Sequence, residues 1–144
     1  MIFYIHGLNA SANSEKLKKL QAFFKEETVA GLEYDSKALD NYDKVFHHLR
    51  AQIDSFKPSN PLLLIGTSLG GYWSSQLSNY YQCKKVLLNP CLFPSKMMAY
   101  KINQEQTIYE TGETYIFTQK MLDALSKKEK NLYKEKTLVF LEMG

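Results

Sequence analysis

Short apolar runs alternate along the chain with longer segments in which apolar residues recur at helical spacing. The runs fall at 1–5, 29–34, 62–65, 86–88 and 137–141, and each predicts a β-strand. The run at 62–65 is continuously apolar, which is typical of a central strand in a parallel sheet with both faces covered. The alternation predicts the α/β class, with a parallel sheet between two layers of helices.

The segments between these runs predict the helices that cover the sheet. Apolar residues from Leu17 to Phe24 follow a Ser- and Asn-rich entry at 11–14 that suits a helix N-cap. A second apolar stripe runs from Tyr42 to Phe56, and two prolines after it stop the helix. Further helices are expected at 72–81 and 119–125, with a short one at 97–102.

Length and composition indicate a single folded domain over residues 1–144. Apolar residues make up 44% of the chain and charged residues 23%, a balance typical of a globular protein. The less regular region at about 91–132 is where a cap or substrate-covering insertion is expected. The apolar runs are too short for a membrane span or a signal-peptide core, so we expect a cytoplasmic protein with no membrane partner.

Charge and cysteine content argue against several function classes. A net charge of +3 is too small to indicate a nucleic-acid partner, and two glutamates interrupt the lysines crowded between 127 and 136. Cys83 and Cys91 form no CxxC pair and have no histidine cluster, so they predict packed, reduced thiols. The chain has no phosphate-binding glycine motif and no metalloprotease motif, and we expect neither a cofactor nor a metal.

The segment from Gly66 to Gly71 matches the pattern G-x-S-x-G and lies between a predicted strand and a predicted helix. In this nucleophile elbow a tight, strained turn lifts a serine hydroxyl clear of the sheet. Glycines such as Gly66 and Gly70 let the neighbouring backbone approach closely. The start of the helix also directs N–H groups at developing negative charge. The pattern predicts Ser68 as an exposed catalytic nucleophile, with a merely structural turn as the alternative.

A second turn, His6-Gly7-Leu8-Asn9, follows the first predicted strand. An oxyanion hole needs two donors; the N–H of Leu69 is one, and the N–H of Leu8 is the natural candidate for the other. His6, at a strand end beside a glycine, is expected to bond to nearby backbone and shape the loop rather than to act as the general base. The residues expected to support the site are His6, Gly7, Asn9, Gly66 and Gly70.

These motifs together resemble the YqiA/YcfP-like esterases, a small bacterial branch of the α/β-hydrolases. The likeness runs through 4–11, 65–72 and 88–90, and 109–115 is similar to the family's N-x-Y-T-G-x-x-Y stretch. The resemblance implies a three-layer α/β-hydrolase fold and a cytoplasmic serine esterase that needs no cofactor and acts on a small acyl ester or thioester. In such an enzyme Ser68 attacks the carbonyl, a histidine takes its proton, and an acid orients that histidine.

The chain departs from the family's pattern at its end. In the family the triad acid follows the strand that corresponds to 137–141, and the histidine follows a later strand; here Gly144 aligns with the glycine before the acid. Beyond the elbow motif the chain has one aspartate, Asp123, and no histidine, while His47 and His48 are expected on the exposed side of a helix. The sequence thus predicts an impaired hydrolase that lacks the family's C-terminal strand and helix. Its rate enhancement would be roughly 10³- to 10⁴-fold, from the oxyanion hole and binding.

Two further expectations follow from this departure. With no strand beyond it, 137–141 would form an exposed apolar sheet edge that favours pairing with a second copy of the chain. The alternative to an impaired esterase is a non-enzymatic pseudo-hydrolase that binds an acyl or carboxylate ligand or a protein partner. Residual hydrolysis that disappears in Ser68→Ala would favour the esterase, and ligand binding that this change leaves intact would favour the pseudo-hydrolase.

Overall fold

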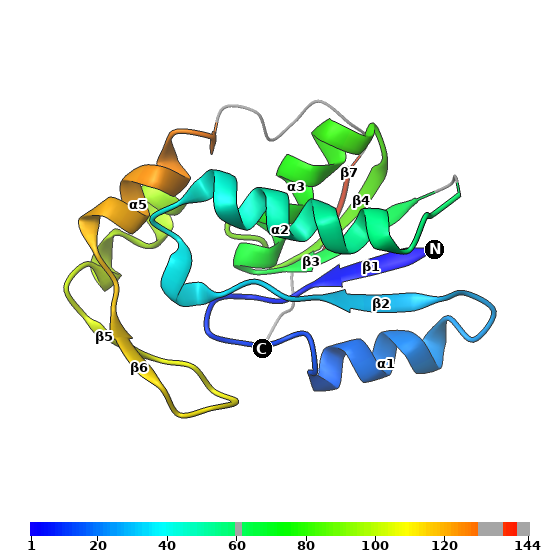
Figure 1. Ribbon diagram of the computed structural model, residues 1–144, viewed down its shortest axis with the longest axis horizontal. Coiled ribbons are helices and arrows are strands. Elements are labelled where there is room, and N and C mark those ends of the chain that lie inside the picture. Colours follow the sequence, from blue (N-terminus) through cyan, green and yellow to red (C-terminus); the bar gives the residue numbers. More distant parts are fainter. Residues whose placement is uncertain (60–61, 130–136, 141–144) are drawn as a thin grey trace.

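A parallel β-sheet forms the centre of the computed structural model, which describes residues 1–59, 62–129 and 137–140 (Figure 1). The sheet has five strands in the order β2-β1-β3-β4-β7, and all neighbouring pairs run parallel. The five predicted apolar runs each supply one strand. The strands are β1 (Ile2–Ile5), β2 (Val29–Leu32), β3 (Leu63–Thr67), β4 (Lys84–Leu88) and β7 (Thr137–Phe140).

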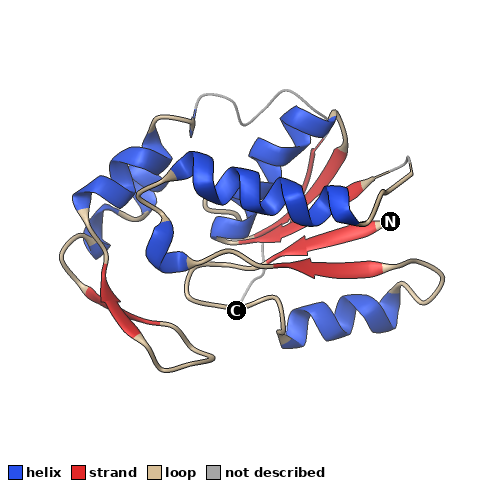
Figure 2. Cartoon of the chain, in the orientation of Figure 1, coloured by secondary structure: helices blue, strands red, loops and turns tan. Residues whose placement is uncertain are grey.

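Helices cover both faces of the sheet, so the molecule has three layers (Figure 2). Helix α1 (Glu15–Phe23) lies on one face, whereas α2 (Tyr42–Ser55) and α3 (Leu69–Tyr81) lie on the other. The side chains of Ser14 and Asn41 cap α1 and α2 by accepting backbone N–H groups of the first turns. The α/β class and the parallel sheet predicted from the sequence are confirmed.

The side chains of β1 alternate between two apolar cores. Phe3 and Ile5 are fully buried in the larger core, against α2 and α3. Ile2 and Tyr4 belong to a smaller core on the side of α1, where Val86 of β4 is only partly buried. Full burial of an apolar side chain stabilises the fold by roughly 1.5–3 kcal/mol, so most of the stabilisation comes from the α2–α3 side.

Residues 89–129, which follow β4, gather at the end of the sheet where the strands finish (Figure 1). The helix predicted at 119–125 is confirmed, and the one predicted at 97–102 is a short α-helix followed by a 3₁₀ turn. The hairpin in this region was not predicted, because its strands are three residues long and mostly polar. No helix in the described part of the chain has the length and apolar content to cross a membrane. The elements are α4 (Pro94–Met97), η2 (Ala99–Lys101), β5 (Glu105–Thr107), β6 (Thr114–Ile116) and α5 (Gln119–Ser126).

Strand β7 lies at one end of the strand order, beside β4. Its register pairs Thr137 with Lys85 and Phe140 with Leu88 of β4. Among the described strands β7 has a neighbour on one side only. Residues 137–140 therefore lie at the edge of the described sheet, and pairing of that edge with a second copy of the chain stays a prediction.

Both cysteines are buried, in line with the packed thiols that the sequence predicted. Burial, with a smaller contribution from the negative charge of Glu129, raises the pKa of the Cys91 thiol to about 11. A thiol with this pKa is neutral at pH 7 and is a poor nucleophile. Cys91 therefore acts as a packing residue beside the sheet.

Gly70, in the first turn of α3, lies against the end of β1. A Cβ added at this position would come within 2.0 Å of the carbonyl oxygen of Ile5 and 2.6 Å of that of His6. Because both atoms are backbone, the helix and the strand would have to separate. We expect Gly70→Ala to lower the free energy of unfolding by about 3 kcal/mol, measured by urea denaturation.

Gly112→Ala is the control for this substitution. Gly112 has a φ of +74°, but a Cβ there would meet no atom within 4 Å. The expected loss is about 1 kcal/mol, from backbone strain alone. Equal losses in the two variants would contradict the close approach of α3 to β1.

Candidate active site

Ser68 lies in the turn that joins β3 to α3, and its side chain is exposed. The backbone has φ 53° and ψ −120°, a strained combination for a residue with a Cβ atom. Its N–H donates to the carbonyl of Leu88 at 3.1 Å, and its carbonyl accepts the N–H groups of Gly71 at 2.9 Å and Cys91 at 2.8 Å. These three bonds hold the turn against a strain of roughly 1–3 kcal/mol.

The two glycines of the G-x-S-x-G pattern lie where backbone segments meet. Gly70 touches the end of β1, as described above. A Cβ on Gly66 would lie 2.2 Å from the carbonyl oxygen of Gly70 and 2.4 Å from Oγ of Ser74. The pattern found in the sequence therefore corresponds to a packed strand-to-helix junction, and any larger residue at Gly66 would push α3 away from the sheet.

The end of β1 approaches Ser68 through Gly7. A Cβ on Gly7 would lie 3.2 Å from Cβ and 3.8 Å from Oγ of Ser68. Leu8 follows Gly7 in this loop, and Leu69 opens α3 directly after Ser68. The structure thus brings together Ser68, Gly7 and the two residues expected to donate N–H groups. The role of Leu8 and Leu69 as an oxyanion hole stays a prediction.

His6 is fully buried behind this loop. Its Nδ1 lies 2.7 Å from the carbonyl oxygen of Gly7, and its ring stacks on Tyr34 with centroids 4.3 Å apart. Since a carbonyl oxygen can only accept, we assign the ring proton to Nδ1. Burial lowers the pKa of His6, although the Gly7 bond and the charges of Glu33 and Glu110 oppose that shift. His6 is therefore a neutral ring that fastens the loop beside Ser68.

Asn9 connects the same loop to the β5–β6 hairpin. Its N–H donates to Oγ of Ser36 at 2.9 Å, and its Nδ2 donates to Oε1 of Gln106 at 3.1 Å. Its Oδ1 accepts the hydroxyl of Tyr115 at 2.5 Å, and its carbonyl accepts the N–H of Tyr109 at 3.0 Å. Asn9 has a φ of 65°, which asparagine tolerates better than most residues. One buried amide thus positions the hairpin against the loop.

The other residues considered as proton acceptors lie away from Ser68. His47 and His48 are exposed on α2, as the helical pattern predicted, and Asp123 on α5 accepts a hydrogen bond from Gln119 at 2.8 Å. Within the described ranges, no hydrogen bond joins Oγ of Ser68 to a histidine or a carboxylate. The described residues therefore place Ser68 beside Gly7 with no base bonded to its hydroxyl.

We expect Asn9→Ala to detach the hairpin from the loop. The change leaves Gln106 and Tyr115 without their partner in a buried setting, so the free energy of unfolding should fall by about 2–3 kcal/mol. Amide hydrogen exchange over 105–116 should become faster. Asn103→Ala is a matched control, because Asn103 also has a φ of 65° but is exposed. Equal effects of both substitutions would mean that backbone strain, and not the amide network, explains the loss.

A model of an uncharacterised protein family, UPF0227, matches residues 1–143. A UPF0227 protein of Pasteurella multocida (strain Pm70) is 32% identical over 143 residues, which cover 98% of this chain and 73% of that protein. The UPF0227 protein YcfP of Escherichia coli O7:K1 is 27% identical over 146 residues, covering 95% of this chain and 79% of YcfP. A relative in Pectobacterium atrosepticum is 30% identical over 109 residues, which span 74% of this chain and 59% of that protein.

Solved structures with a similar fold are α/β-hydrolases. Est1E from Butyrivibrio proteoclasticus, solved with ferulic acid, has a TM-score of 0.68 at 17% identity over 96% of this chain and 66% of Est1E. Alpha/beta hydrolase domain-containing protein 10 from mouse has a TM-score of 0.58 at 12% identity over 99% of this chain and 79% of the mouse protein. At these identities the likeness shows the fold alone, and it confirms the α/β-hydrolase fold expected from the sequence.

Proposed function

The chain belongs to the UPF0227 family, and we propose that it is an esterase-type hydrolase with Ser68 as the nucleophile. The observation that carries the proposal is the exposed hydroxyl of Ser68 on a strained turn, with Gly7 packed beside it. Strained backbone of this kind persists where the surrounding structure holds it, and it concentrates at reactive sites. The loop after β1 and the start of α3 meet at this serine.

The proposed reaction is acyl transfer from an ester or thioester to water. Oγ of Ser68 attacks the carbonyl carbon, and the carbonyl π electrons move onto oxygen. The N–H groups of Leu8 and Leu69 stabilise that oxyanion, and each such donor contributes roughly 10²- to 10³-fold in rate. Collapse expels the alcohol or thiol, which takes up the serine proton, and leaves an acyl group on Ser68. Water then attacks this acyl-enzyme, releases a carboxylic acid and restores the serine.

The substrate class that we propose is a small acyl ester or thioester. Est1E, a structural relative, is solved with ferulic acid, which is a carboxylic acid and therefore of the class of product that this reaction releases. We expect the acyl group to enter above Ser68 between Gly7 and Cys91, since these two residues lie against it. The alignments span 59% to 79% of the relatives' lengths, so this proposal concerns the 144-residue chain.

The same geometry also supports a second candidate function. Because no described histidine bonds to Oγ of Ser68, the serine loses its proton to solvent and acylates slowly. A site with an oxyanion pocket and a slow nucleophile can also serve to bind a carboxylate. A non-enzymatic pseudo-hydrolase that holds an acyl or carboxylate ligand is therefore the competing proposal.

Labelling with a fluorophosphonate probe tests the nucleophile. We expect the parent chain to react at Ser68 and to hydrolyse p-nitrophenyl acetate at roughly 10³- to 10⁴-fold over the water reaction, the level retained without a complete triad. Ser68→Ala should abolish the labelling and reduce hydrolysis to background. The matched control is Ser55→Ala, which removes another exposed serine hydroxyl, one that donates only to the carbonyl of Gln52.

The outcomes separate the two candidate functions. Labelling that survives in Ser68→Ala would contradict the assignment of the nucleophile. A parent chain that neither labels nor hydrolyses, but binds butyrate in a saturable way that Ser68→Ala leaves unchanged, would favour the pseudo-hydrolase.

A further inference from the structure

Tyr34 follows the carboxyl end of β2 and contacts the loop that carries Gly7. The register pairs Leu32 with Ile5, so the two chains leave β2 and β1 side by side. The hydroxyl of Tyr34 donates to the carbonyl of His6 at 3.0 Å, and its ring lies at an angle of only 4° to the imidazole. One side chain from the segment after β2 thus contacts both the backbone and the ring of His6.

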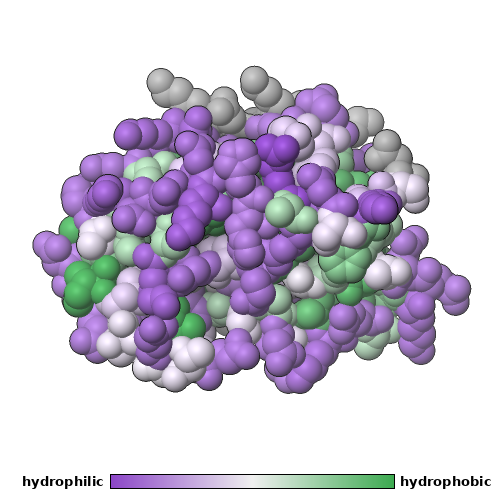
Figure 3. Space-filling model, viewed as in Figure 1, coloured by the Kyte–Doolittle hydropathy of each residue, from purple (hydrophilic) through white to green (hydrophobic). Residues whose placement is uncertain are grey.

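Both rings of this stack are buried, at 0% exposure for His6 and 4% for Tyr34, although the face of the molecule drawn in Figure 3 is mainly hydrophilic. Burial, with smaller contributions from neighbouring groups, raises the pKa of the Tyr34 hydroxyl well above its usual range, so the hydroxyl keeps its proton at pH 7 and can donate. On α3, Trp73 also contacts the Tyr34 ring, with centroids 6.1 Å apart. A hydrogen bond in such surroundings is stronger than one in water.

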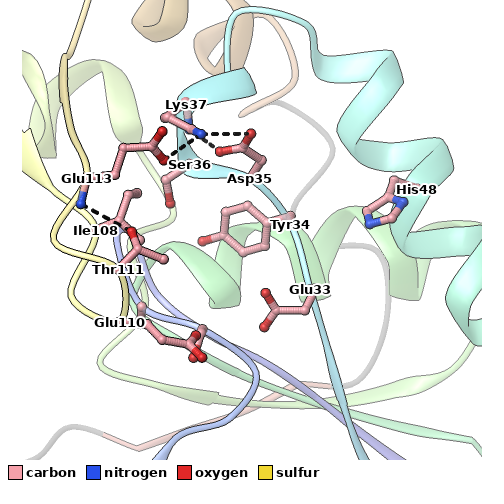
Figure 4. Close-up of a pocket in the computed structure, with 12 residues that line it drawn as sticks. Glu33, Tyr34, Asp35, Ser36, Lys37, His48, Ile108, Glu110, Thr111 and Glu113 are labelled. Atoms are coloured by element: carbon pink, nitrogen blue, oxygen red, sulfur yellow. Dashed lines mark hydrogen bonds and ion pairs between the residues drawn. The ribbon is translucent and has the colours of Figure 1, made fainter.

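Tyr34 also borders a cavity of about 310 Å³, which we call the acidic cavity (Figure 4). Figure 4 shows its side chain projecting from the same segment as Glu33 and Asp35. Tyr34 lines this cavity, whereas His6 does not. Because the two rings are stacked, the Tyr34 ring shields the imidazole from solvent that enters the cavity. The charged residues of the lining are Glu33, Asp35, Lys37, Glu110 and Glu113.

The hydrogen bonds of the stack hold two successive peptide groups. Tyr34 holds the carbonyl of His6, and Nδ1 of His6 holds the carbonyl of Gly7 at 2.7 Å. These carbonyls belong to the peptide planes on either side of the Gly7 Cα, so together they restrict its φ and ψ. A Cβ at Gly7 would lie 3.2 Å from Cβ of Ser68, which favours glycine here. Glycine has the widest backbone freedom of any residue, and the two bonds remove that freedom.

We propose that Tyr34 is a positioning residue for the acyl-transfer site and that, through His6, it holds the N–H of Leu8 in the direction that stabilises an oxyanion. The catalytic part of this inference rests on the proposed function of Ser68. The N–H of Leu8 lies in the second of the two peptide planes. An oxyanion hole works by donors whose directions are set before the reaction. When the Tyr34 bond is lost, Gly7 regains its freedom and that direction is no longer fixed.

Tyr34→Phe removes the hydroxyl and keeps the stacked ring. We expect kcat for p-nitrophenyl acetate to fall roughly tenfold, a part of the 10²- to 10³-fold that loss of an oxyanion donor costs, with KM changed by less than about twofold. Tyr72→Phe is the matched control, because the Tyr72 hydroxyl is also buried and donates to a backbone carbonyl, that of Leu125 at 2.7 Å. Both variants should lose similar stability in urea denaturation, but Tyr72→Phe should keep the parent's kcat. An equal fall of kcat in both variants, or an unchanged kcat in Tyr34→Phe, would overturn the proposal.

Backbone dynamics test the positioning independently of catalysis. From ¹⁵N relaxation, the order parameters of Gly7 and Leu8 should be about 0.85 in the parent and in Tyr72→Phe, and below about 0.6 in Tyr34→Phe. A flexible Gly7 in the parent, which needs no variant to detect, or a rigid Gly7 in Tyr34→Phe would overturn the proposal. A parent chain that neither labels nor hydrolyses would instead contradict the proposed function of Ser68, while the order parameters would still decide whether Tyr34 holds the loop.

Discussion

The strained backbone of Ser68 depends on strands that flank β3 on both sides. The Ser68 turn is bonded to Leu88 and Cys91 at the end of β4, and it packs against Gly7 at the end of β1. The strand order β2-β1-β3 places the second strand on one side of β1 and the third on the other, which creates a topological switch point between β1 and β3. Loops that follow the two strands diverge there and leave a crevice, where open α/β sheets bind their ligands.

The loop after β1 connects three parts of the molecule. Gly7 faces Ser68, the buried ring of His6 stacks on Tyr34 after β2, and Asn9 holds the β5–β6 hairpin. The hairpin in turn contributes Glu110 and Glu113 to the acidic cavity, which Glu33 and Lys37 also line. Four consecutive residues therefore join the candidate active site, the chain after β2 and the hairpin, and any shift of the loop moves all three together.

The sequence predicted the features whose signals are local. The apolar runs and the G-x-S-x-G pattern located the strands and the turn, because both lie within a few residues. Helix α3 begins earlier than expected, at Leu69, since the close packing at Gly70 overrides the low helix propensity of glycine. Phe23 was assigned to the apolar stripe of α1 but is 79% exposed, while its neighbour Phe24 packs on the smaller core. Periodicity alone does not separate two adjacent aromatic residues.

Contacts between distant segments left no signal in the sequence. Asn9 meets Gln106 across 97 residues and Tyr115 across 106, and the acidic cavity combines Glu33 with Glu110. The residues next to each of these side chains in the sequence do not indicate its partner. Their juxtaposition follows from the strand order and from the hairpin, whose short polar strands give no periodic pattern. A site assembled in this way becomes visible only when the sheet and its loops are placed in space.

A single peptide unit links His6 to the candidate oxyanion hole. The carbonyl of Gly7, which accepts the bond from His6, and the N–H of Leu8, the proposed donor, belong to the same planar group and point in opposite directions. By donating to this carbonyl, His6 fixes the direction of the Leu8 N–H on the opposite side of the peptide plane. The buried ring of His6 thus holds the plane of the peptide whose N–H is proposed to stabilise the oxyanion.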